Sequence, residues 1–196
     1  MPMLRLVPRR FASPVSPFVI ASLQPTSTPR FLAHRHPRNS STANMAATDT
    51  TLRTFFQSPK FAVVGASTNE QKFGYKVFVW YVNHGLQVTP VNPGSKAIKV
   101  GDEELPTIAS LSELEEPTET SVSIITPPPV TLKTLKEAKE LGIPAVFLQP
   151  GTFNDEVLQF ARDNFKAAVG GEGGWGSEGW CVLVDGERGL KAVGKL

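Results

Sequence analysis

Short apolar segments alternate with segments of helical periodicity along most of this chain, and this alternation limits the folds open to it. Five apolar segments have the length of strands, and strand and helix alternate at intervals of roughly 25–30 residues. The predicted strands are residues 60–65, 86–91, 120–126, 145–148 and 167–169. Apolar strands separated by helices are typical of βαβ units, in which helices cover both faces of a parallel sheet.

Helices are expected between these strands. The predicted helices are residues 51–57, 74–84, 111–115, 127–141 and 154–164. Ser110 and Glu113 have the spacing of a capping box, and residues 96–106 have the composition of a polar loop. After the fifth strand we expect a final strand at 181–184 and a helical turn or two at 187–193. The sequence therefore predicts an α/β fold, a Rossmann-like three-layer sandwich with a mainly parallel sheet of about five strands.

The first 48 residues differ from the rest in composition. They contain six arginines, no lysine and no acidic residue, and they are rich in Ser, Thr and Pro. This composition matches a mitochondrial transit peptide, and the alternative is a tail with no targeting role. We expect a disordered basic leader at 1–48, a folded domain at 51–196 and a mitochondrial matrix location, or a cytoplasmic location if translation starts at Met45.

The net charge of +2 does not describe the folded part. Six of the 20 basic residues lie in the leader, so 14 basic and all 18 acidic residues fall in 49–196, which carries a net charge of −4. A mildly acidic domain gives no reason to expect a nucleic-acid partner. No apolar run is long enough to span a bilayer, so no membrane partner is expected. The single cysteine, Cys181, excludes an intrachain disulfide framework and a cysteine zinc cluster.

Four predicted strands end in small, polar or proline-rich residues. These strand ends are residues 65–68 (GAST), 91–94 (VNPG), 126–129 (TPPP) and 149–152 (QPGT). In an open parallel sheet, ligands bind beyond the carboxyl ends of the strands. Gly65 permits a tight turn, Ser67 and Thr68 supply hydroxyls, and Gly74 begins the next helix, whose free N–H groups favour a phosphate. The sequence thus predicts a nucleotide site at these loops.

The first loop is not a dinucleotide fingerprint. Only Gly65 fits the G-x-G-x-x-G spacing, and Asn92 and Pro93 end the second strand where an NAD protein would carry an acidic residue. NAD therefore fits less well than another nucleotide, although Gly65 and Gly74 could also serve strand–helix packing alone. Nearby lysines could neutralise phosphates or be ordinary surface residues, and Lys96 ranks first among them because it follows the second strand. These lysines are Lys72, Lys76, Lys96 and Lys99.

The order of these motifs resembles a known family. Residues 63–67 (VVGAS), 72–77 (KFGYKV) and 91–93 (VNP), followed by the loops at 126–129 and 149–151, are similar to stand-alone CoA-binding domain proteins. Those proteins are similar in turn to the N-terminal CoA-binding domain of the succinyl-CoA synthetase alpha subunit. The resemblance covers residues 51–169 and implies a Rossmann-like fold with CoA or an acyl-CoA across the strand ends.

The resemblance also implies a set of contacts. The loop at 65–67 and Gly74 would line the diphosphate, and Pro93 and Lys96 would lie beside the nucleotide phosphates. The residues at 126–128 would flank the adenine or the upper pantetheine. Gln149 and Gly151 would close the far side. The candidate binding residues are Gly65, Ala66, Ser67, Thr68, Lys72, Gly74, Asn92, Pro93, Lys96, Thr126, Pro127, Pro128, Gln149 and Gly151.

The synthetase activity is not implied, because its phosphorylated histidine belongs to a second domain that this chain lacks. His84, the one histidine of the folded part, is expected to be structural or exposed. We expect CoA binding without catalysis, and the alternatives are an enzyme acting on a CoA thioester, an NAD(P)-binding protein or an interaction protein. The glycine-rich tail at 170–179 could be a lid, with Trp175 and Trp180 suited to a homodimer or another protein partner. Cys181 could form a mixed disulfide with CoA or be a small buried strand residue.

Overall fold

The computed structural model describes residues 40–196, with side chains from Asp49 onward, so the predicted leader lies mostly outside the described residues. Five strands form one sheet in the order β2-β1-β5-β6-β7. They are β1 (Lys60–Val64), β2 (Gln87–Val91), β5 (Thr120–Ile124), β6 (Ala145–Leu148) and β7 (Ala167–Val169). Every neighbouring pair in this sheet is parallel. The predicted α/β class and parallel five-stranded sheet are confirmed.

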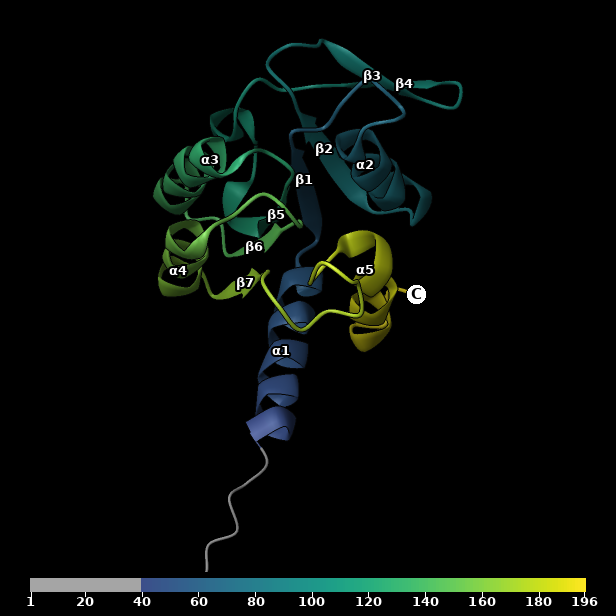
Figure 1. The fold of residues 1–196 in the computed structure, drawn as a ribbon. Helices are drawn as coiled ribbons and strands as arrows, with labels where there is room; N and C mark the ends of the chain where they lie inside the picture. The colour runs from purple at the N-terminus through teal and green to yellow at the C-terminus, as the bar shows by residue number, and fades with distance from the viewer. Residues whose placement is uncertain (1–39) are drawn as a thin grey trace, which may run out of the picture. The chain divides into compact units, whose positions relative to one another are not determined.

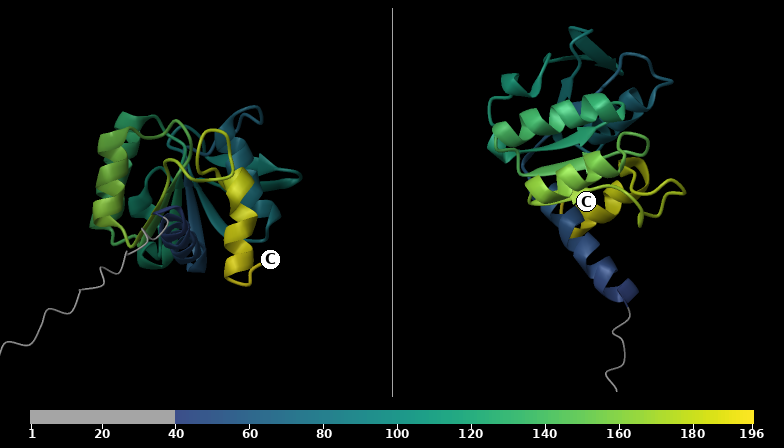
Figure 2. Two further views of the ribbon diagram at one scale, coloured as in Figure 1. Left: turned by 60° about the horizontal axis from the view of Figure 1, so that its bottom comes forward. Right: turned by 60° about the vertical axis from the view of Figure 1, so that its left-hand side comes forward.

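Helices cover both faces of the sheet. One face carries α1 (Ser40–Gln57), α2 (Phe73–Asn83) and α5 (Val182–Ala192), and the other carries α3 (Pro128–Glu140) and α4 (Asp155–Asn164). Figure 1 shows α3 and α4 on one side of the strands and α2 and α5 on the other, and Figure 2 shows the same three layers from two further directions. Two short 3-10 helices, η1 (Leu111–Glu113) and η2 (Pro117–Glu119), precede β5.

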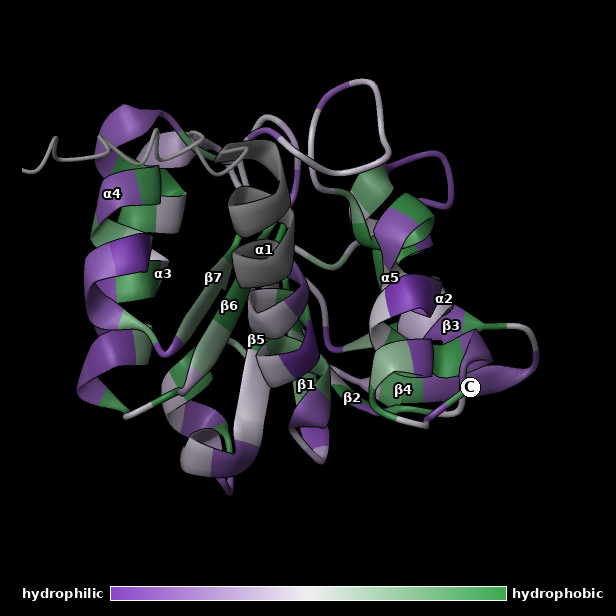
Figure 3. Cartoon of the chain, turned by 90° about the horizontal axis from the view of Figure 1, so that it is seen from below, coloured by the Kyte–Doolittle hydropathy of each residue, from purple (hydrophilic) through white to green (hydrophobic). Residues whose placement is uncertain are grey.

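The strands divide their side chains between two cores. On β1, Phe61 and Val63 pack in the core beneath α1, α2 and α5, whereas Ala62 and Val64 pack in the core beneath α3 and α4. Successive side chains of a strand point to opposite faces, so a strand covered on both sides buries its side chains on both, and residues 61–64 of β1 are all apolar. Figure 3 shows this as hydrophobic residues along β6 and β7, with hydrophilic residues on the outward side of α4.

The prediction of a polar loop at residues 96–106 is wrong. This segment forms a two-stranded antiparallel hairpin of β3 (Ala97–Val100) and β4 (Glu103–Pro106). Gly101 makes the turn with φ +60°, Ile98 is fully buried, and the Tyr75 hydroxyl donates to the Lys99 carbonyl oxygen at 3.2 Å. The strands are short and carry charges on their exposed side, which gave the segment the composition of a loop. The Ser110 side chain does not cap η1, although the Glu113 carboxylate accepts from Ala109 N–H at 3.1 Å.

The predicted strand at 181–184 is also wrong, because Cys181 is the N-cap of α5. The buried Asp185 carboxylate accepts from Cys181 N–H at 3.0 Å and from Trp175 N–H at 2.8 Å. Gly186 and Gly189 face aromatic side chains, since an added Cβ would lie 2.4 Å from Trp80 Cζ2 and 2.1 Å from Phe56 Cδ2 respectively. These two glycines lower the helical propensity of the segment but allow α5 to pack closely.

Helix α1 begins at Ser40, earlier than the predicted start at Thr51. Its last turns bury Leu52, Phe55 and Phe56 in the core, and Met45 lies within the helix. The predicted boundary between leader and domain therefore falls inside a helix. Within residues 40–196, no helix is both long and apolar enough to cross a bilayer.

Candidate ligand cleft at the switch point

The sheet order places a switch point between β1 and β5. The helix after β1, α2, packs on one face of the sheet, and the helix after β5, α3, packs on the other, so the two connections diverge. Open α/β sheets bind ligands where connections diverge in this way. A cavity of about 600 Å³ lies there, lined by the ends of β1, β2 and β5 and by the first turns of α2 and α3. Eight predicted site residues line it: Gly65, Ala66, Ser67, Lys72, Gly74, Asn92, Pro93 and Thr126.

Two glycines bring α2 against the end of β1. Gly65 has φ +86°, and a Cβ there would lie 2.9 Å from the Ile125 carbonyl oxygen. A Cβ on Gly74 would lie 2.1 Å from the Gly65 carbonyl oxygen. Neither position can carry a side chain without moving the backbone. The close packing that the sequence suggested is thus present, and it sets the first turn of α2 beside the cavity.

The N-terminus of α2 is free to bind an anion. The N-cap residue, Lys72, makes no side-chain capping bond, and the first turn holds no acidic residue. The loop before it is shaped by its own side chains, because Ser67 Oγ accepts from Asn69 N–H at 3.1 Å and Asn69 Oδ1 accepts from Gln71 N–H at 2.9 Å. The first N–H groups of a helix lack intrahelical acceptors and lie at the positive end of its dipole. This turn therefore suits a phosphate.

The N-terminus of α3 has the opposite character. Pro127 is its N-cap, and Pro128 and Pro129 follow in the first turn, so three successive residues lack an N–H donor. The Thr126 and Thr131 hydroxyls bond each other at 2.9 Å. This turn therefore lacks the free backbone donors of α2, and the α3 residues that line the cavity are Val130, Lys133, Thr134 and Glu137. A single ligand in the cleft would thus meet a helix N-terminus on the α2 wall, and on the α3 wall one apolar side chain, Val130, beside polar and charged ones.

Asn92 holds the walls in place. Its Nδ2 donates to the Ala66 carbonyl oxygen at 2.8 Å, and its Oδ1 accepts from Gly94 N–H at 2.8 Å. The side chain ties the loop after β2 to the loop after β1. Both the Nδ2 and the Oδ1 of Asn92 are thus hydrogen-bonded within the protein. An NAD protein would carry a ribose-binding carboxylate at this position.

Six predicted residues do not line this cavity: Thr68, Lys96, Pro127, Pro128, Gln149 and Gly151. Gln149 has a structural role that explains its position. It is buried, its Nε2 donates to Ser123 Oγ at 3.0 Å, and its Oε1 accepts from Val182 N–H at 3.0 Å. Its amide therefore joins β5 and β6 to the start of α5. Lys96 is exposed at the base of the β3–β4 hairpin.

The structure adds residues that the strand-end argument missed. Phe73, Val130, Lys133, Thr134 and Glu137 also line the cavity, as do residues 109–111. Glu137 Oε1 accepts from Ser112 N–H at 3.0 Å and thereby holds the loop at η1 against α3. The four α3 residues fall at positions i, i+3, i+4 and i+7, which places them on one face of the helix. That spacing was a signal available in the sequence.

His84 and Cys181 stay apart from the cleft lining. His84 Nδ1 lies 2.7 Å from the Trp80 carbonyl oxygen and its ring centroid lies 4.1 Å from that of Trp80, so the side chain packs against α2. Cys181 is buried, and burial raises the pKa of its thiol. In the described residues, no group of three or more His, Cys, Asp and Glu side chains could hold a metal ion.

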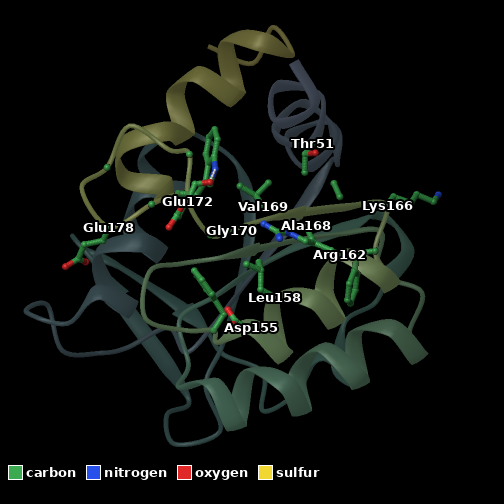
Figure 4. Close-up of a pocket in the computed structure, with 18 of the residues that line it drawn as sticks. Thr51, Asp155, Leu158, Arg162, Lys166, Ala168, Val169, Gly170, Glu172 and Glu178 are labelled. Atoms are coloured by element: carbon green, nitrogen blue, oxygen red, sulfur yellow. Dashed lines mark hydrogen bonds between the residues drawn. The ribbon is translucent and has the colours of Figure 1, made fainter. Parts of the chain in front are cut away.

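A larger cavity, of about 1180 Å³, lies beside the edge strand β7 and the glycine-rich loop. Figure 4 shows Arg162 near Gly170 and Ala168, with Glu172 and Glu178 on the glycine-rich side. Trp180, which is buried, donates from Nε1 to the Glu172 carbonyl oxygen at 3.1 Å and so supports this loop. The cavity sits at an edge of the sheet with side chains of both charges, and it lacks the uncapped helix N-terminus of the switch-point cleft.

Residues 59–178, more than half of the chain, match the profile of the CoA binding domain family. The chain belongs to this family. A conserved hypothetical protein from Pyrococcus furiosus is 28% identical, with a TM-score of 0.53 over 64% of this chain and 97% of that one. A protein from Thermus thermophilus is 26% identical, with a TM-score of 0.57 over 72% and 98%. A hypothetical protein from Pyrococcus horikoshii OT3, 24% identical with a TM-score of 0.60 over 73% and 92%, shares the fold. Comparison with curated proteins finds no match.

Proposed function

We propose that this member of the CoA binding domain family binds CoA or an acyl-CoA in the switch-point cleft. The observation that carries the proposal is the uncapped N-terminus of α2, which Gly74 brings against Gly65 at the cavity wall. The diphosphate of the ligand binds at this turn, where backbone N–H groups and the helix dipole favour negative charge. Family membership supports CoA over other nucleotides.

Two lysines complete the anion site. Lys72 stands at the N-cap of α2 and Lys133 lies on α3, and both line the cavity. An ammonium group bonds a phosphate more strongly than it bonds a neutral acceptor. Val130, in the first turn of α3, supplies apolar contact for the adenine or the upper pantetheine.

The protein acts as a binding module without catalysis of its own. The titratable side chains that line the cleft among the described residues are Lys72, Lys133 and Glu137, and Glu137 is engaged with Ser112. Neither His84 nor Cys181 lines the cleft. A nucleophile paired with a base, as acyl transfer requires, is therefore not supported at this site in the described part of the chain.

Calorimetric titration of the full chain with CoA, dephospho-CoA and NAD tests the proposal. Wild type binds CoA, binds dephospho-CoA more weakly and does not bind NAD. Lys72→Ala weakens CoA binding about tenfold. Lys76→Ala is the matched control, because Lys76 lies on the same helix and does not line the cleft. Equal loss in both variants would show a general charge effect and would count against the site.

The subcellular location of the protein is a separate proposal. The acid-free, arginine-containing leader directs the full chain to the mitochondrial matrix. A fluorescent fusion of the full chain should co-localise with a matrix marker, whereas a fusion that starts at Met45 should remain in the cytoplasm. The same location for both fusions would refute the targeting role.

A further inference from the structure

Two exposed apolar side chains line the switch-point cleft. The large hydrophobic residues exposed in the described part of the chain are Phe73, Val130, Trp175, Val184 and Leu196. Leu196 ends the sequence, and Trp175 and Val184 belong to the glycine-rich loop and the start of α5. Phe73, 57% exposed, and Val130, 49% exposed, both line the cavity. Two of the exposed large hydrophobic side chains therefore lie at the proposed binding site.

The two residues stand on opposite walls. Phe73 is the first residue of α2, and Val130 lies in the first turn of α3, on the other face of the sheet. Each has a lysine of the cavity beside it, because Lys72 precedes Phe73 and Lys133 follows Val130 by one turn. Each wall therefore presents an apolar surface next to an ammonium group. Such a surface fits a ligand in which an anionic group and an apolar group are direct neighbours.

CoA has this arrangement on one side of its diphosphate. Towards the adenosine, the next group is a ribose, which carries polar oxygens. Towards the pantetheine, the next groups are a methylene and a carbon bearing two methyl groups. NAD, FAD and ATP share the adenosine side with CoA but lack the dimethyl carbon. The apolar pair beside the phosphate site thus matches the part of CoA that distinguishes it from these nucleotides.

We infer that Phe73 and Val130 hold the dimethyl segment of pantetheine between them and so select CoA over other adenosine diphosphate derivatives. The inference rests on the proposed function and adds the part of the ligand that these side chains recognise. Burial of two methyl groups and the adjoining methylene between two apolar side chains strengthens binding. Removal of either side chain should weaken CoA binding about tenfold.

The test compares two ligands by calorimetry on the full chain. CoA contains the pantetheine, and adenosine 3′,5′-bisphosphate contains the adenosine and the 3′-phosphate but no pantetheine. Phe73→Ala and Val130→Ala should weaken CoA binding about tenfold and leave the affinity for the bisphosphate unchanged. Val184→Ala is the matched control, because Val184 is 48% exposed and lies outside the cleft. Thermal melts confirm that the variants fold.

The outcomes separate this inference from the proposed function. If Phe73→Ala weakens both ligands equally, its ring contacts the adenosine part, and the inference is overturned. If CoA affinity is unchanged in both variants, the inference is also overturned, while CoA binding stands. If wild type binds neither ligand, the proposed function itself fails.

Discussion

Gly74 of α2 packs directly against the carbonyl oxygen of Gly65 at the end of β1, where a Cβ on Gly74 would lie 2.1 Å from that oxygen. This contact sets the distance between the strand end and the first turn of the helix. The same contact places the first turn of α2, whose first N–H groups lack intrahelical acceptors, at the lining of the cavity. The close contact between Gly74 and Gly65 thus contributes both to the packing of α2 on β1 and to the proposed anion site.

Gly74→Ala should lower the free energy of unfolding by about 2 kcal/mol and weaken CoA binding, because the new methyl group must displace backbone. Urea denaturation and calorimetry measure the two effects. Gly101→Ala is the control, since Gly101 has φ +60° and open space around an added Cβ. It should lower stability by about 1 kcal/mol and leave CoA affinity unchanged. A Gly74→Ala variant with wild-type stability and affinity would disprove the role of this contact.

Gln149→Ala should destabilise the protein without changing the CoA affinity of the folded fraction. The substitution leaves the buried Val182 N–H and Ser123 hydroxyl without their partner, at a cost of about 2 kcal/mol. Urea denaturation measures the loss, and Gln159→Ala, at an exposed position, should change stability by less than about 0.5 kcal/mol. Loss of CoA affinity with unchanged stability would show that Gln149 contacts the ligand.

Asp185→Ala should destabilise α5 and the glycine-rich loop together, because one carboxylate accepts from both Trp175 and Cys181. We expect a loss of about 2–3 kcal/mol and faster proteolysis within residues 170–179. Asp163→Ala, at an exposed position on α4, is the control. Proteolysis of the loop at the wild-type rate would show that Asp185 does not anchor it.

Cys181 should react slowly in the folded protein. Burial raises the pKa of its thiol, so the thiolate is scarce near neutral pH. The raised pKa stabilises the fold below the ordinary thiol pKa, and this contribution is lost as the pH rises through the folded pKa. Alkylation by iodoacetamide should therefore be much slower in buffer than in urea. Rapid formation of a mixed disulfide with CoA in the folded protein would contradict this account.

The sequence predicted the sheet well because its buried strands are mostly apolar, as in β6 and in residues 61–64 of β1. It also placed Gly65, Gly74 and Asn92 at the cleft, since strand-end loops carry ligands in such sheets. The failures have particular causes. The helical turn or two predicted at 187–193 lies largely within α5, but Gly186 and Gly189 concealed the full length of this helix, because their role depends on Trp80 and Phe56, which are distant in sequence.

The site was predicted only in part for a related reason. The residues at each strand end can be recognised from their local composition. Which strand ends lie next to one another depends on the order of the strands in the sheet, and local composition does not reveal that order. Gln149 follows β6, and its amide oxygen accepts from Val182 N–H at the start of α5, a contact that no local pattern indicates. Lys133 and Glu137 reach the cleft from the body of α3, so a search confined to loops missed them.

Backbone amide chemical shifts would report whether CoA binds at the N-terminus of α2. We would titrate the isotopically labelled full chain with CoA and follow the backbone amide resonances. We expect the largest shifts at Ser67, Phe73 and Gly74, with little change at residues 167–173 beside the larger cavity. Shifts centred on residues 167–173, or no shifts at all, would contradict this expectation.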